Sequence, residues 1–311
     1  GPHGIVDWMI ATPFWAEGGG TGSGGVASFC STLQNALEVR DMGYFWNWWM
    51  DTTPQTPGGE AYLTPNYTAA SPAGFTAAAA QMKLRGVHAF PYLEGRIMDL
   101  KLPDWKAEHA EDYACGVSPG QIQMEFYGKL FGVMDPATPY WQEKMARAIS
   151  KVTDLAPGVD GLYIDQVTGA CALACRGAKS GHKAGGGTSW VDGGRKMFAR
   201  GKAAIGADRA VISESNSEVY MSAVDGYLTL QGWNNCGAVP AWQAVYGGYS
   251  LNIGASYQSV MTLPAPYFFS PDFPALLATQ FVWGSVMGGD SLNEWEASLY
   301  FSNSSNEATR S

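Results

Sequence analysis

Short apolar segments alternate with helix-like segments along most of this chain of 311 residues, and this alternation limits its fold more than any other feature. A crossover between parallel strands needs a helix or a segment of similar length, so alternation is typical of a parallel sheet. Eight strand-like units predict an α/β fold, a (β/α)8 TIM barrel built as a single domain over residues 1–311 with long loops after its strands. The expected strands are Gly4–Phe14, Met42–Met50, Val87–Leu93, Val159–Val167, Ala210–Ser213, Gly226–Leu230, Ala241–Tyr249 and Phe281–Met287.

Helices are expected between these strands. They cover Ala27–Arg40, Phe75–Arg85, Pro139–Leu155, Val191–Ile205 and Phe273–Gln280, with a short one around Ser217–Ala223. Lys101–Pro136 has little periodicity and is interpreted as an insertion. An open doubly wound sheet would alternate in the same way, but the glycine-rich loop Gly18–Gly25 lacks the Lys-Ser/Thr pair of a phosphate-binding loop.

Composition excludes some classes of partner. The net charge of −9 and the pI near 4.9 argue against nucleic acid, whose phosphates require a basic surface. No apolar run has the length of a membrane span. Five cysteines are too few for a disulfide-stapled scaffold. Gly1–His3 resembles a cloning remnant and Ser302–Ser311 a disordered tail, so the chain could belong to a larger multidomain protein. We expect a secreted or periplasmic monomer.

Asp165 is the strongest candidate for a catalytic residue. It ends the apolar segment Val159–Val167, in which side chains alternate between two faces and Asp165 shares its face with Tyr163. A carboxylate at the carboxyl end of a buried strand lies where a barrel enzyme binds its substrate. The alternative is that Asp165 caps the turn that follows.

A second carboxylate, Glu214, ends the next strand. Neighbouring strands lie about 4.8 Å apart, so Asp165 and Glu214 can face each other across a small substrate. Glycoside hydrolysis needs such a pair, with one carboxyl group ionised and the other protonated, and a separation of roughly 5 Å would suit a retaining mechanism. In that scheme Asp165 is the nucleophile and Glu214 the general acid/base. Glu218 competes for the acid role, but it is expected on the first turn of a helix, and a favourable charge at the helix N-terminus is the interpretation preferred for it.

A family resemblance supports this interpretation. The motifs GLYIDQV, GHKAGGGTSWVDG, SESNSE and DGYLTLQGW resemble a group of bacterial glycoside-hydrolase-like barrels, largely described as a domain family of unknown function. That group is distantly similar to endo-alpha-N-acetylgalactosaminidases and to alpha-amylase type barrels. The resemblance implies an Asp nucleophile after the fourth strand and a Glu acid/base after the fifth, and the matching residues here are Asp165 and Glu214.

Further residues are candidates for substrate contact because they end strands or follow them. Tyr92 and Glu94 share a face of the third strand, although Glu94 could instead pair with Arg96 or Lys101. The remaining candidates at or beyond strand ends are Asp51, Gln166, Gln231 and Trp233. Trp46 is a candidate within the second strand, some of whose tryptophans must lie in the core. Asp225 begins the sixth strand, so it lies at the wrong end of the barrel and is expected to be structural.

The loop after the fourth strand holds Cys171, Cys175 and His182. Three such residues could bind zinc, but a fourth ligand is not visible, and a Cys171–Cys175 disulfide or free thiols are favoured instead. His182 could bind a sugar hydroxyl or hold the loop by hydrogen bonds. Trp190 could stack on a sugar or lie in the core.

We therefore expect a hydrolase that cleaves O-glycosidic bonds of an oligo- or polysaccharide without a cofactor. The first alternative is a metal-assisted hydrolase that uses carboxylates and His182 as ligands. The second is a carbohydrate-binding barrel without catalytic activity. A Schiff-base mechanism is not favoured, because no lysine ends a predicted strand.

Overall fold

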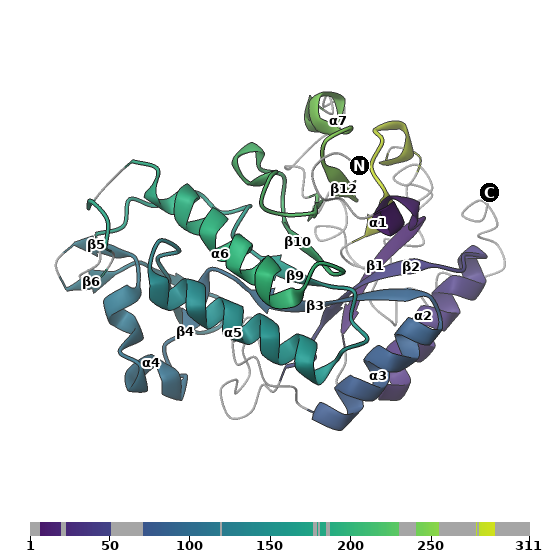
Figure 1. Ribbon diagram of the computed structural model, residues 1–311, viewed down its shortest axis with the longest axis horizontal. Coiled ribbons are helices and arrows are strands. Elements are labelled where there is room, and N and C mark those ends of the chain that lie inside the picture. The colour runs from purple at the N-terminus through teal and green to yellow at the C-terminus, as the bar shows by residue number, and fades with distance from the viewer. Residues whose placement is uncertain are drawn as a thin grey trace.

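A (β/α)8 barrel is present, as the sequence predicts. The computed structural model describes residues 7–19, 23–50, 71–118, 120–176, 179, 181–184, 187–229, 241–254, 278 and 280–289. Eight parallel strands form one sheet, and an isolated parallel bridge between Ile253 and Val286 joins its two end strands (Figure 1). Around the barrel the strands are β1 (Phe14–Gly19), β2 (Met42–Asn47), β3 (Val87–Glu94), β9 (Gly161–Asp165), β10 (Ala210–Glu214), β11 (Gly226–Leu228), β12 (Leu251–Ile253) and β13 (Met287–Gly289).

Helices cover the outside of this sheet, and Figure 1 shows α5 beside α6 and α2 beside α3. Helix α5 has the predicted bounds, because its apolar residues at helical spacing form one buried stripe and the Thr138 side chain accepts a hydrogen bond from the N–H of Trp141. No helix of the described residues is long and apolar enough to cross a membrane. The larger helices are α2 (Ser23–Leu37), α3 (Pro72–Leu84), α5 (Pro139–Leu155) and α6 (Ser189–Ile205).

The barrel interior is filled by aromatic rings. The ring of Trp15 lies 5.3 Å from that of Phe45 and 5.1 Å from that of Phe90, and the rings of Phe45 and Tyr163 are 5.2 Å apart. Gly43 lies against Trp15, where a Cβ atom would overlap the indole. These rings form a rigid core below the carboxyl ends of the strands.

The predicted first strand, Gly4–Phe14, is wrong. Its described residues form a short helix, α1 (Asp7–Ala11), and β1 begins only at Phe14. Gly18, predicted to open a glycine-rich loop, instead belongs to β1. A glycine fits there because the Tyr44 side chain occupies the space that a Cβ atom would need.

The predicted strand Ala241–Tyr249 is also wrong, because its first residues form helix α7 (Ala241–Tyr246). Trp242 and Tyr246 are four residues apart, and their rings pack 4.5 Å from each other on one side of that helix. The predicted strand Phe281–Met287 overlaps β13 only at Met287. Of the predicted helix Phe273–Gln280, only 278 and 280 lie within the described residues, and both are helical.

The insertion Lys101–Pro136 is more regular than its sequence indicates. It pairs with the chain after β3 in a small antiparallel sheet of order β4-β8-β7, and a second pair, β5-β6, adjoins it. Short segments with many exposed residues explain the weak periodicity. Its elements, with β4 just before it, are β4 (Ile97–Asp99), α4 (Pro103–Ala107), η3 (Ala110–Tyr113), β5 (Gly116–Ser118), β6 (Gln121–Ile122), β7 (Met124–Phe126) and β8 (Leu130–Val133).

Candidate active site

Three carboxyl groups lie together at the carboxyl ends of three neighbouring strands. Asp165 ends β9, Glu214 ends β10 and Glu94 ends β3. Parallel pairing places Glu94 opposite Asp165, and Ile164 opposite Ser213, the residue before Glu214. The structure therefore brings together the two carboxylates predicted to be catalytic, and it adds Glu94 as an immediate neighbour.

Both oxygens of the Asp165 carboxyl group accept hydrogen bonds from tyrosines. The hydroxyl of Tyr92 lies 2.8 Å from Oδ2, and that of Tyr163 lies 2.8 Å from Oδ1. Burial and the charge of Asp165 raise the pKa of both phenols well above 10.0, so each keeps its proton to donate. The backbone N–H of Gln166 adds a further hydrogen bond to Asp165.

The residue after Asp165 turns the chain sharply. Gln166 has a positive φ of 64°, a conformation that is uncommon outside glycine, and its N–H donates to both Asp165 and Glu214. The side-chain Oε1 of Gln166 is buried and has no hydrogen-bond partner within the described part of the chain. The backbone of Gln166 thus holds the carboxyl pair. Its side-chain amide oxygen is a buried acceptor that no described residue satisfies.

Asp165 and Glu214 differ in how their surroundings affect ionisation. Burial raises the pKa of Glu214 well above 4.5, and the negative charge of Asp165 raises it further. Burial also raises the pKa of Asp165, but the hydrogen bonds from Tyr92 and Tyr163 oppose that shift. A hydrogen bond joins the two carboxyl groups, and it raises the pKa of Glu214 while lowering that of Asp165. The arrangement favours a protonated Glu214 beside an ionised Asp165.

Glu94 is a third carboxyl group of the cluster and is fully buried. Its Oε1 accepts a hydrogen bond of 2.9 Å from the backbone N–H of Arg96, and Tyr92 Oη lies 3.1 Å from its Oε2. The Tyr92 hydroxyl has one proton and two carboxyl neighbours. When it donates that proton to Asp165, a protonated Glu94 can donate to the Tyr92 oxygen. Burial and the charge of Asp165 accordingly raise the pKa of Glu94 well above 4.5.

Two further polar residues near the site were not predicted. Glu17 lies on β1, where its Oε1 accepts a hydrogen bond from the side chain of Asn47 at the end of β2. The charge of Glu17 contributes to the raised pKa of Tyr163, which places it near the carboxyl cluster. Glu17 directly follows the apolar run Phe14–Ala16, and this signal is visible in the sequence once β1 is placed correctly.

Two of the predicted tryptophans, Trp46 and Trp190, lie in the core. Trp46 is fully buried and packs on Phe75 at 4.6 Å between ring centroids, and Trp190 in α6 is only 5% exposed. Neither presents a face on which a sugar could stack. The neighbouring Trp49 donates a hydrogen bond of 2.8 Å to the carbonyl of Tyr92 and so steadies the end of β3. The predicted contacts Asp51, Gln231 and Trp233 lie outside the described residues.

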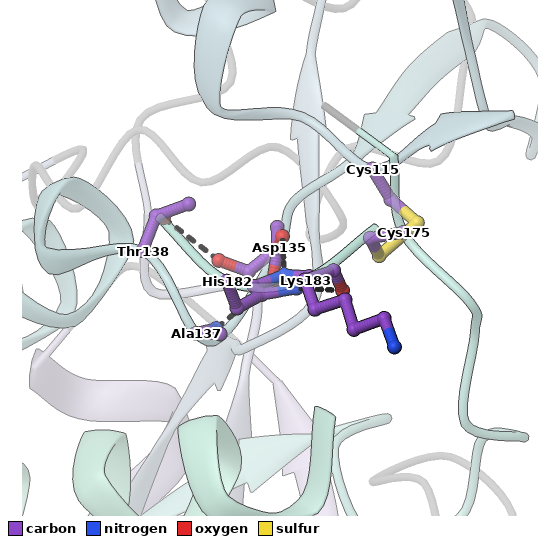
Figure 2. Close-up of a disulfide and its surroundings, with 7 residues drawn as sticks. All are labelled: Cys115, Asp135, Ala137, Thr138, Cys175, His182 and Lys183. Atoms are coloured by element: carbon purple, nitrogen blue, oxygen red, sulfur yellow. Dashed lines mark hydrogen bonds and ion pairs between the residues drawn. A yellow bond between two sulfur atoms is a disulfide. The ribbon is translucent and has the colours of Figure 1, made fainter. Parts of the chain in front are cut away.

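His182 contacts Asp135 instead of the carboxyl cluster. Its Nε2 lies 2.8 Å from Oδ2 of Asp135, and its Nδ1 lies 3.0 Å from the carbonyl oxygen of Lys183 (Figure 2). Asp135 is buried next to Thr138, which caps α5. The interaction with Asp135 contributes to a raised pKa of His182. These contacts favour a histidine that fixes the loop after β9, one of the two roles considered for it.

The predicted Cys171–Cys175 disulfide is wrong. Cys175 is bonded to Cys115, 60 positions earlier in the chain (Figure 2). Cys171 is a free, exposed thiol. The backbone explains this pairing, because the N–H of Arg176 donates to the carbonyl of Gly116 and lays the loop along the insertion. The disulfide therefore joins the loop after β9 to the insertion after β3.

Two acidic residues are separate from the cluster. Glu218 is exposed and forms a hydrogen bond with Tyr246 that raises the pKa of that phenol. Asp225 accepts hydrogen bonds from Lys202 and from the N–H of Val211 at the opposite end of the barrel, which agrees with the structural role predicted for it. Among the described residues, no group of three His, Cys, Asp or Glu side chains is placed to hold a metal ion.

Sequence comparison identifies the family. Residues 3–257 match a family described as a domain of unknown function, DUF6259. The chain belongs to this family. A Monosiga brevicollis protein named "Putative glycoside hydrolase 22789" is 30% identical over 226 residues, which cover 68% of this chain and 18% of that protein. Because this relative is eukaryotic, the bacterial origin implied by the resemblance is not confirmed.

Solved structures share the fold. The ligand-free structure of an alpha-N-acetylgalactosaminidase from Bifidobacterium bifidum superposes with a TM-score of 0.62 at 11% identity, covering 88% of this chain and 47% of that one. An alpha-galactosidase from Thermus thermophilus superposes with a TM-score of 0.61 at 13% identity, covering 94% and 64%. The DUF6259 chain thus spans less than two thirds of each of these proteins.

Proposed function

We propose that this DUF6259 barrel is the catalytic domain of a glycoside hydrolase that cleaves O-glycosidic bonds of an oligo- or polysaccharide. Asp165 is the nucleophile and Glu214 the general acid/base. The observation that carries the proposal is the geometry of the pair, since Asp165 and Glu214 end neighbouring strands and the hydroxyls of two tyrosines lie 2.8 Å from the two oxygens of Asp165. Burial and the charge of Asp165 also raise the pKa of Glu214, as a general acid requires. The relative named as a glycoside hydrolase and the glycosidases that share the fold support the same reaction class.

The reaction has two steps. Asp165 attacks the anomeric carbon while Glu214 transfers its proton to the leaving oxygen, and the glycosidic bond breaks. Glu214, now ionised, then takes a proton from water, which attacks the anomeric carbon and releases Asp165. The direct hydrogen bond between the two carboxyl groups supports retention, because an inverting pair is held about 6.5–9.5 Å apart to admit a water molecule.

Alpha-linked hexosides are the proposed substrate class. The two solved glycosidases that share this fold carry names of enzymes acting on alpha-N-acetylgalactosaminyl or alpha-galactosyl groups. A metal-assisted reaction is less well supported, because His182, its proposed ligand, is already held by Asp135 and Lys183. We also propose secretion, since a disulfide that joins two segments persists in an oxidising compartment.

The test is a screen of chromogenic alpha- and beta-glycosides with the wild type and the Asp165→Asn variant. We expect turnover by the wild type and a loss of more than about 10³-fold in kcat for the variant, with substrate binding retained. Asp154→Asn, an exposed change on α5, is the matched control and should keep full activity. Full activity of Asp165→Asn would refute the assignment. Sugar binding by a wild type that forms no product would indicate a binding barrel instead.

A further inference from the structure

The β7–β8 hairpin of the insertion reaches the carboxyl cluster through Arg96. The Nη1 atom of Arg96 lies 2.5 Å from Oε1 of Glu125 on β7, and the hydroxyl of Tyr127 lies 3.4 Å from the other oxygen of Glu125. The backbone N–H of Arg96 donates to Glu94, which ends β3. A continuous chain of polar contacts therefore runs from Glu94 to the turn of the hairpin.

Arg96 has hydrogen-bonding capacity that the described residues do not use. Its side chain is only 8% exposed, yet its Nε has no hydrogen-bond partner in the part of the chain that the structure describes. A buried N–H group without a partner is uncommon in folded proteins. The positive charge of Arg96 also lowers the pKa of Glu214, so the guanidinium lies within electrostatic reach of the acid/base residue.

The two faces of the hairpin differ. Glu125 points to Arg96, whereas its neighbours Met124 and Phe126 are 47% and 70% exposed, as expected for alternation along a strand. Tyr127 follows at the turn, where its ring packs edge-on against Phe131 and is 37% exposed. Its hydroxyl contacts Glu125, so Tyr127 lies on the side of the hairpin that faces Arg96. Burial and the charges of Glu125 and Glu94 raise the pKa of Tyr127.

We propose that Arg96, Glu125 and Tyr127 form a second sugar-binding subsite next to the carboxyl cluster. It takes the pyranose unit that adjoins the unit held at Asp165. The proposal rests on the proposed function of that cluster. Guanidinium N–H groups donate to sugar hydroxyls, a carboxylate accepts from them, and an exposed ring supplies an apolar face for the sugar ring.

The charge balance indicates a neutral sugar. Arg96 is already paired with Glu125, and the negative charge of Asp165 lies nearby. A carboxylated or sulfated sugar would be repelled by Asp165, and the guanidinium that could compensate for its charge is already paired. The ligand class is therefore a neutral oligosaccharide of at least two pyranose units.

Kinetics on short and long substrates test the subsite. The long substrate is the neutral oligosaccharide that the wild type cleaves fastest, and the short one is an aryl glycoside of its terminal sugar. Tyr127→Ala should lower kcat/KM about tenfold for the oligosaccharide, the loss expected for one stacked ring, and leave the aryl glycoside unchanged. Tyr127→Phe keeps the ring and should retain kcat/KM within about threefold on both substrates.

Phe126→Ala is the matched control, because it removes an exposed ring from the other face of the same hairpin. It should change neither substrate's kinetics. Two results would overturn the subsite: Tyr127→Ala with wild-type kcat/KM on the oligosaccharide, or equal losses on both substrates, which would indicate a structural defect.

A binding measurement separates the subsite from the reaction. Wild type, Tyr127→Ala and Phe126→Ala are applied to an array of neutral oligosaccharides of about two to six units, the lengths that can span both positions. The subsite predicts that Tyr127→Ala loses binding to the longer glycans while Phe126→Ala keeps it. Equal binding by Tyr127→Ala and wild type would reject the subsite and leave the hydrolase proposal standing. A wild type that binds and cleaves no neutral glycan would reject both.

Discussion

The hydroxyl of Tyr163 lies 2.8 Å from Oδ1 of Asp165, two residues further along the same strand. Their common face follows from strand geometry, because side chains two residues apart point the same way. Tyr92 holds the other carboxyl oxygen from the neighbouring strand. Two phenols from rigid strands thus fix the carboxylate in position before substrate arrives.

Removing one of these phenols should change the pH profile. A hydrogen bond donated to a carboxylate favours its charged form, so Tyr163→Phe raises the pKa of Asp165. The acidic limb of kcat/KM should therefore move up by about one pH unit, with little change at higher pH. Tyr220→Phe is the control, since that buried hydroxyl has no partner among the described residues. An acidic limb that stays in place would show that Tyr163 does not tune Asp165.

Glu214 should set the alkaline limb. Burial and Asp165 raise its pKa, so Glu214 keeps its proton above its ordinary range and activity falls when that proton is lost at higher pH. Glu214→Gln should remove this limb and lower kcat by about 10²–10⁴-fold for poor leaving groups, with a much smaller loss for a dinitrophenyl glycoside. Glu218→Gln should behave as wild type. The reverse pattern in the two variants would assign the acid role to Glu218.

Glu94 should make stability fall as pH rises. Its pKa is raised in the folded state, so the folded protein binds this proton more tightly than the unfolded chain. The stabilisation is fully present below the ordinary pKa of 4.5 and is lost as pH rises from there through the folded pKa. The free energy of unfolding should fall by about 1.4 kcal/mol for each pH unit that separates the folded pKa from the unfolded one.

The Glu94→Gln variant removes this titration while keeping the size of the side chain. Urea titrations give the free energy of unfolding of the variant minus that of the wild type at two pH values. This difference should be larger at about pH 8, above the ordinary pKa, than at about pH 4.5, near it. Glu111→Gln, an exposed change in the insertion, is the control. An equal effect of Glu94→Gln at the two pH values would mean that Glu94 ionises in the folded state as it does in the unfolded chain.

The disulfide should contribute strongly to stability. Cross-linking residues 60 positions apart restricts the unfolded chain, so the paired change Cys115→Ala and Cys175→Ala should cost about 4 kcal/mol in free energy of unfolding. Cys171→Ala, which removes a free exposed thiol, should cost almost nothing. Denaturant titration measures both, and mass spectrometry after alkylation without reductant checks the pairing. A peptide linking Cys171 to Cys175 would contradict the structure.

Much of this fold is predictable where local signals are strong. The helix Pro139–Leu155 has a proline at its first turn, a capping threonine and an apolar stripe, and its bounds agree with the structure. The strand ends at Asp165 and Glu214 follow from apolar runs that stop at a carboxylate. The long-range juxtaposition of these residues then follows from the barrel alone, because its strands are parallel.

Each failed prediction has a physical cause. The glycines of β1 indicate a loop in the sequence, but they pair with β2 in the sheet, and the Tyr44 side chain occupies the space that a side chain at Gly18 would need. In α7, six residues are too few to distinguish helical from strand periodicity. The Cys115–Cys175 pairing and the contact of Glu125 with Arg96 depend on how the insertion folds back, and spacing along the chain carries no information on that.

Covalent trapping tests the central claim most directly. A 2-deoxy-2-fluoro glycosyl fluoride of the sugar identified by the screen is incubated with the wild type, and the digested protein is mapped by mass spectrometry. A retaining mechanism predicts one glycosyl group per chain, carried by the peptide that contains Asp165 and esterified to that residue. A label on Glu214 or Glu94, or a product of inverted anomeric configuration with no label at all, would contradict Asp165 as the nucleophile.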